Sequence, residues 1–146
     1  MSRHPASKRF LTAVTLGVLS GFLCIYLASR GHPEMANPFN PLFWIVFTDR
    51  VLIGMMVAFA GAFTVHPILG FSYHPWLRGA CLGAVVSLPI APGVLITPPT
   101  NGPLSAWVIF WGTIVAGAIY GSVIDWVATR VGGQGAALLP ADDTHK

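Results

Sequence analysis

The chain has 146 residues, of which 54% are hydrophobic and only 9% are charged, and its formal net charge is +3. Soluble domains contain about a quarter charged residues, so this composition excludes an ordinary water-soluble protein. It also leaves no basic surface suited to nucleic acid. We therefore expect a single integral membrane domain over residues 1–146.

Four apolar runs are long enough to cross a bilayer, which takes about 20 residues of helix. They lie at 10–29, 42–65, 77–97 and 104–128. The sequence thus predicts an all-α fold, a polytopic bundle of four transmembrane helices, with a flexible cytoplasmic tail over 131–146. The first run follows a basic start, as a secretory signal does, but it is too long for a signal core and ends near bulky Tyr26. We interpret it as a retained anchor.

Each run carries a ladder of small residues spaced four apart. In lipid, helices associate by close backbone approach along such stripes. The predicted packing residues are Ala13, Gly17 and Gly21, then Gly54 and Ala58, then Gly79 and Gly83, and finally Gly117 and Gly121. This pattern predicts that each helix has a specific partner in a compact bundle.

The ladders of the two halves align with each other. Gly17 matches Gly83 and Gly54 matches Gly117 when the chain is cut after the second run. Two interpretations remain open: a tandem duplication of a helix hairpin, or chance recurrence of residues that are common in membrane helices.

Basic residues indicate the orientation. An even number of spans places both termini on one side, and that side carries Arg3, Lys8, Arg9, Arg78, Arg130 and Lys146, against Arg30 in the opposite loops. Cytoplasmic segments carry this excess of Lys and Arg. Both termini are therefore predicted to be cytoplasmic, in a plasma (cell inner) membrane.

Asp49 and Arg50 are the most unusual pair, because charges inside a membrane helix are costly and mark functional sites by default. Neighbouring helical residues point about 100° apart, so we do not expect the two to satisfy each other directly. In one interpretation Arg50 lies in a polar cavity and binds an anionic substrate. In the other the helix begins at Thr48 or Asp49, and Arg50 reaches water near the outer face.

Asp125 is the other acid within a predicted span. Trp126 beside it indicates the inner interface, and Thr129 and Arg130 are its expected partners. It is either an ion-coupling residue or an interfacial acid. Arg50 lies toward the opposite leaflet, so we do not expect the two to pair within one subunit.

The third run is interrupted by Pro89 and Pro92, each of which removes a helix donor. Broken helices in transporters line ion and substrate sites, and on this interpretation Ser87, Pro89, Pro92 and Gly93 lie on the path. The alternative is a kinked or early-ending helix packed under the outer loop.

No residues form a recognisable reaction centre. His66 and His74 share one loop but have no Cys, Asp or Glu beside them, which makes a poor metal site. Cys24 and Cys81 lie in spans without polar neighbours and are interpreted as packing residues. We therefore expect no catalytic residue, metal or cofactor, and an enzyme is the least favoured class.

Two functions remain. The first is an accessory or scaffold subunit of a membrane complex, whose partners are the lipid bilayer and either further copies of the chain or other membrane subunits. The alternative is a small oligomeric ion or solute transporter or channel that uses Asp49, Arg50, Asp125 and the broken third helix.

Overall fold

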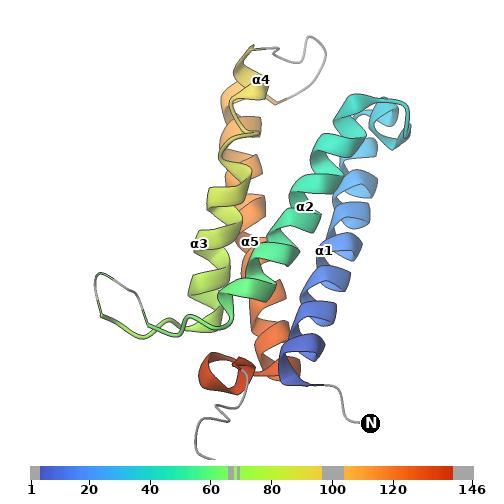
Figure 1. The fold of residues 1–146 in the computed structure, drawn as a ribbon. Coiled ribbons are helices and arrows are strands. Elements are labelled where there is room, and N and C mark those ends of the chain that lie inside the picture. The colour runs from blue at the N-terminus through green and yellow to red at the C-terminus, as the bar shows by residue number, and fades with distance from the viewer. Residues whose placement is uncertain (1–3, 66–67, 69, 97–103, 140–146) are drawn as a thin grey trace, which may run out of the picture.

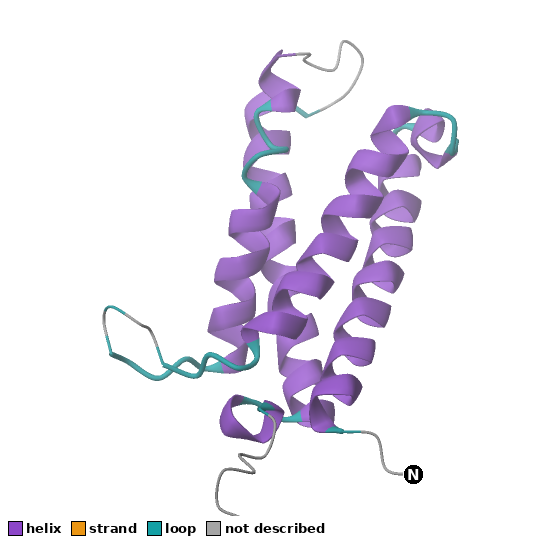
Figure 2. Cartoon of the chain, viewed as in Figure 1, coloured by secondary structure: helices purple, strands orange, loops and turns teal. Residues whose placement is uncertain are grey.

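The computed structural model describes residues 4–65, 68, 70–96 and 104–139. This part of the chain is helical and contains no β-strand, only an isolated bridge between Val65 and Ser72 (Figure 2). Its elements are α1 (Pro5–Ser29), η1 (Pro33–Ala36), α2 (Pro41–Ala60), α3 (Pro75–Ser87), α4 (Gly93–Ile96), α5 (Ala106–Gly132) and η2 (Gly135–Leu138). The all-α prediction is confirmed.

The helices form two hairpins that lie side by side. Helix α1 packs along α2, and α3 packs along α5, while α1 and α2 also contact α5 (Figure 1). The start of α1 and η2 lie at the same end of the bundle. The two hairpins converge at this end and diverge toward the other (Figure 1).

Three helices, α1, α2 and α5, are long and apolar enough to cross a membrane. Helix α3 has only 13 residues, which is about 20 Å and shorter than a hydrocarbon core of about 30 Å. It ends at Ser87, and after a turn over 88–92 the chain forms α4, which contacts α5. The predicted run 77–97 is therefore an interrupted helix, whose last residue lies outside the described part.

Helix α2 begins earlier than one sequence interpretation allowed. Pro41 is its first residue, and the side chain of Asn40 accepts a hydrogen bond from the Leu42 amide at 3.0 Å. This is a standard N-cap, because a side-chain oxygen satisfies an amide that has no partner inside the helix. The expectation that the helix starts at Thr48 or Asp49 is wrong.

Part of the predicted tail is folded. Helix α5 continues to Gly132, and η2 follows it directly. The Gly135 amide donates to the Gly61 carbonyl at 2.9 Å, and Gly135 has a φ of +66°, which glycine adopts readily. The chain after α5 is thus held against the end of α2, and residues 140–146 lie outside the described part.

The structure places the ladder residues at the closest helix contacts. A Cβ on Gly17 would lie 2.8 Å from the Arg50 carbonyl oxygen, and one on Gly54 would lie 2.6 Å from the Ala13 carbonyl oxygen. In the other hairpin a Cβ on Gly83 would overlap the Gly117 backbone. The positions that match between the two halves of the sequence therefore make corresponding contacts in the two hairpins.

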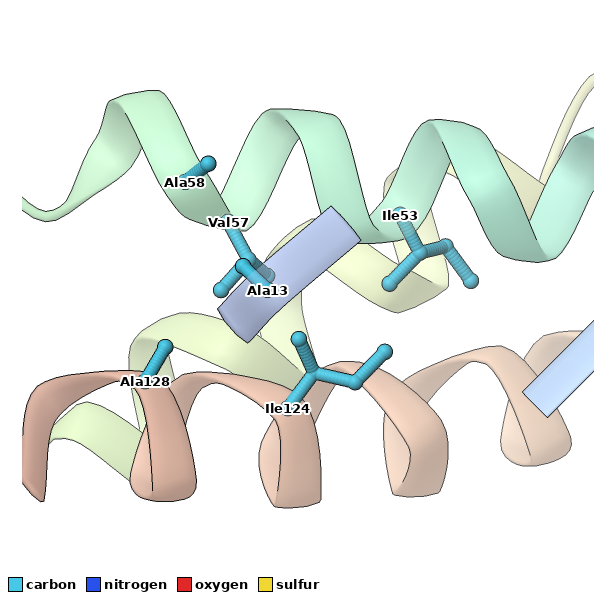
Figure 3. Packing of buried hydrophobic residues seen from close by; sticks show 6 residues of the cluster. All are labelled: Ala13, Ile53, Val57, Ala58, Ile124 and Ala128. Atoms are coloured by element: carbon cyan, nitrogen blue, oxygen red, sulfur yellow. The ribbon is translucent and has the colours of Figure 1, made fainter. Parts of the chain in front are cut away.

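A small apolar core joins the hairpins. It contains Ala13 from α1, three residues of α2 and two of α5 (Figure 3). The six are Ala13, Ile53, Val57, Ala58, Ile124 and Ala128. Most large apolar side chains elsewhere are exposed, as expected of helices whose outer surface faces lipid.

We predict different effects on stability for two substitutions in α5. Gly117→Ala places a methyl group against Ser87 and the Gly83 carbonyl, whereas Gly112→Ala places it in open space. The first should lower the free energy of unfolding by about 1–3 kcal/mol, and the second should leave it unchanged or raise it by up to about 1 kcal/mol. SDS titration of the detergent-solubilised protein measures both. Equal effects would show that the Gly83–Gly117 contact is not close.

Candidate functional site

The buried polar side chains of the described residues form two separate clusters with half-buried neighbours, and each cluster includes groups from α1, α2, α3 and α5. The terminal cluster, at the end where the hairpins converge, contains Arg9, Arg78, Asp125, Thr129 and Gln134. The central cluster contains Cys24, Asp49, Arg50, Ser87 and Tyr120. Backbone carbonyls of α2 complete the terminal cluster.

Asp125 binds two arginines in the terminal cluster. Arg78 donates to both of its carboxylate oxygens, from Nε at 2.8 Å and Nη2 at 3.0 Å, a bidentate arrangement. Arg9 Nη2 forms an ion pair with Asp125 Oδ1, and Thr129 Oγ1 donates to the same oxygen at 3.3 Å. Arg9 and Asp125 are both fully buried. One carboxylate therefore connects α1, α3 and α5.

Two arginines and one aspartate leave this cluster with one excess positive charge, and backbone carbonyls accept its remaining donors. Arg9 donates to the carbonyls of Val57 at 2.9 Å and Ala58 at 3.3 Å, in the last turn of α2. It also donates to the Gly133 carbonyl at 3.1 Å, just after α5. A helix C-terminus carries a partial charge of roughly −0.5. The ends of α2 and α5 together can therefore offset the excess charge.

Glycines provide the space for Arg9. A Cβ on Gly61 would overlap the Arg9 guanidinium, and a Cβ on Gly132 would overlap the Arg9 backbone. The α1 helix can therefore approach the ends of α2 and α5 only because neither position has a side chain.

The central cluster lies at the middle of α2, and its charges are balanced. Arg50 Nη1 donates to Asp49 Oδ2 at 2.6 Å and to Ser87 Oγ at 3.3 Å. Ser87 Oγ lies 3.1 Å from Asp49 Oδ2, to which it can donate. The guanidinium also lies 4.9 Å from the centre of the Tyr120 ring, in a cation–π contact. Arg50 Nε is buried and has no partner among the described residues.

Three expectations about this region need correction. Asp49 and Arg50 do bond to each other, because the long arginine side chain curls back to the preceding carboxylate despite the angle between their Cα–Cβ bonds. Arg50 also does not reach water near a helix start, since it is 4% exposed and lies midway along α2. Cys24 does have a polar neighbour, because Arg50 Nη2 lies 3.8 Å from its sulfur.

The other predicted path residues lie apart from the central cluster. Asp125 belongs to the terminal cluster, so it does not pair with Arg50. Pro89, Pro92 and Gly93 are exposed around the break between α3 and α4. Of the predicted path residues, the structure therefore brings only Asp49, Arg50 and Ser87 into contact.

Sequence reasoning treated Arg9 and Arg78 as ordinary basic residues of the cytoplasmic end, and it expected Arg130 rather than these two beside Asp125. Arg130 instead lies over the Trp126 ring, 4.6 Å from its centre. A usable signal was present. Arg9 lies four residues before Ala13, and Asp125 four residues after Gly121, so both continue the buried stripe of their helix.

The described residues contain no group of three or more His, Cys, Asp or Glu side chains that could hold a metal ion. His66 lies outside the described part, so its relation to His74 is not described. The sequence matches no protein-family model and no curated protein, and the fold matches no solved structure. The two clusters are therefore interpreted from their own residues.

We predict that Asp125→Asn strongly destabilises the bundle, because it leaves two buried arginines without a counter-ion. Removing one partner of a buried ion pair costs about 3–5 kcal/mol. Glu34→Gln is a suitable control, since Glu34 is exposed and, among the described residues, pairs with half-exposed His32 alone. SDS titration should show a large loss for the first variant and less than about 1 kcal/mol for the second. A similar small loss in both would contradict a structural role for the terminal cluster.

Proposed function

We propose that the chain crosses a plasma (cell inner) membrane four times, with α3, the turn and α4 together forming a broken third span. Four spans place both termini on one side, in agreement with the shared end of α1 and η2 (Figure 1). That end carries Lys8, Arg9, Arg78 and Arg130, whereas Arg30 lies at the other. This distribution supports cytoplasmic termini.

Within that membrane, we propose that the protein is a non-catalytic accessory or scaffold subunit. The observation that carries this proposal is the terminal cluster, in which a buried carboxylate, two arginines and two helix ends bond α1, α2, α3 and α5 together. A bundle joined in this way resists relative movement of its hairpins at that end. Its exposed apolar side chains remain available to lipid or to the helices of another subunit.

A small oligomeric transporter or channel is the second candidate, favoured by the central cluster. Arg50 combines burial, a balancing acid and an Nε donor that has no partner among the described residues. Such a donor can donate a hydrogen bond to an anionic or carbonyl oxygen of a solute. The hairpins diverge beyond this cluster, and the third span is broken beside Ser87 (Figure 1).

The scaffold role predicts a defined hetero-complex. Gentle extraction from the native membrane, followed by measurement of the intact mass, should give this chain and a different membrane protein in a fixed ratio. The two purified proteins should then reassemble in that ratio in lipid nanodiscs. A homo-oligomer without other chains, or a ratio that varies between preparations, would contradict the proposal.

The transport role predicts that Arg50 is required for flux. Proteoliposomes would be given gradients of radiolabelled phosphate or chloride, and the radioactivity retained would be followed with time. A transporter of one of these anions should dissipate its gradient faster than protein-free liposomes do. Arg50→Lys, which keeps a cation beside Asp49 but lacks the Nε donor, should abolish the difference while the oligomer stays intact. Asp125→Asn is unsuitable here because it disturbs the terminal cluster. Rates equal to protein-free liposomes for every gradient would count against anion transport.

A further inference from the structure

A groove of about 730 Å³ lies beside the terminal cluster, between the first turns of α1 and the last turn of α2. Its lining includes Ser7, Arg9, Phe10, Phe59, Ala62 and Leu138. The Phe10 and Phe59 rings contact each other edge to face, with centroids 5.7 Å apart, and both side chains are exposed. The groove therefore combines an apolar wall with a polar position at Ser7, near the end of the bundle.

Cations surround this end of the bundle. Among the described residues it carries Lys8, Arg9, Arg78 and Arg130, and Asp125 is the only acid there. Arg9 itself lines the groove, but its buried guanidinium is bonded within the terminal cluster, so the exposed Lys8 is the cation next to Ser7. The positive end of the α1 dipole lies at the same place. An occupant of the groove is therefore favoured if it is negatively charged.

The shape and charge together select an amphiphile. An apolar wall accepts an acyl chain, and a cationic rim at the depth where a span meets the membrane surface accepts an anionic headgroup. We propose that this groove binds one anionic phospholipid, with its phosphate beside Ser7 and Lys8 and one acyl chain along Phe10 and Phe59. The inference requires that the chain is embedded in a bilayer, and it holds for either function proposed above.

Native mass spectrometry of the full chain in nonionic detergent tests this inference. Dioleoyl phosphatidylglycerol and dioleoyl phosphatidylcholine would be titrated separately. The binding constant for the first bound lipid molecule would then be compared between the two lipids. We expect phosphatidylglycerol to bind at least about fivefold more tightly, the factor expected from one nearby cation. Equal binding of the two lipids would overturn the proposal.

Matched variants locate the site. Ala62→Phe fills the groove and should abolish the preference, whereas Ala118→Phe, at a half-buried alanine of α5 outside the groove, should keep it. Lys8→Gln should weaken phosphatidylglycerol binding about fivefold, and Arg130→Gln should not, because Arg130 lies over Trp126. An unchanged preference in folded Ala62→Phe would overturn the proposal. Equal losses of phosphatidylglycerol binding in Lys8→Gln and Arg130→Gln would also overturn it, because they would indicate a general attraction to the protein surface. If Ala62→Phe does not fold, the comparison of Lys8→Gln with Arg130→Gln tests the proposal without it.

Discussion

A buried arginine has to be neutralised inside the bundle, and this constraint determines how the helices are arranged. Arg9 is fully buried although it lies near the start of α1. Its guanidinium donors bond to Asp125, Thr129 and three backbone carbonyls. In an apolar medium any one of these bonds would be costly to leave unmade. The ends of α2 and α5 must therefore both lie against the face of α1 that carries Arg9.

The glycine contacts and the polar clusters depend on each other. Glycines let the helix backbones approach closely, and only at that separation can an arginine from one helix reach the carbonyls of another. Gly61 and Gly132 illustrate this, because a side chain at either position would displace Arg9. In return, the ion pairs fix which faces of the helices meet, since sliding one helix along another would leave a charge unpaired. Close packing alone specifies this register less strongly than packing combined with charge pairing.

The elements that the sequence predicted well depend on local patterns. Length and apolarity were sufficient for α1, α2 and α5, and the prolines indicated where α3 would be interrupted. The pairing of charges was not predictable in this way, because Arg78 and Asp125 are 47 residues apart and only the tertiary fold brings them together. The prediction that Asp49 and Arg50 do not bond to each other was wrong for a different reason. The Cα–Cβ bonds of the two residues point apart, but the arginine side chain is long enough to curl back to the preceding carboxylate.

The spacing of residues within the ladders predicts the members of the two clusters better than the residue types alone do. Arg50 lies four residues before Gly54, and Ser87 lies four residues after Gly83. Arg9 and Asp125 extend their own ladders in the same way. A polar residue in step with a small-residue stripe faces the neighbouring helices rather than lipid, because positions four apart share a helix face. This periodicity distinguishes Arg9 from Lys8, its exposed neighbour, although composition and position treat the two alike.

The two clusters differ in what they allow the bundle to do. The terminal cluster has an excess charge that is satisfied only while α2 and α5 keep their ends against Arg9, so separating the hairpins there would expose an unpaired cation to lipid. The central cluster is neutral, and Asp49 and Arg50 lie on the same helix. That pair can stay intact if α2 moves away from Ser87 and Tyr120. Any relative movement of the hairpins should therefore pivot about the terminal cluster and open from the other end, where α3 is already interrupted. A rigid subunit would use the first cluster alone, whereas a transporter would need both.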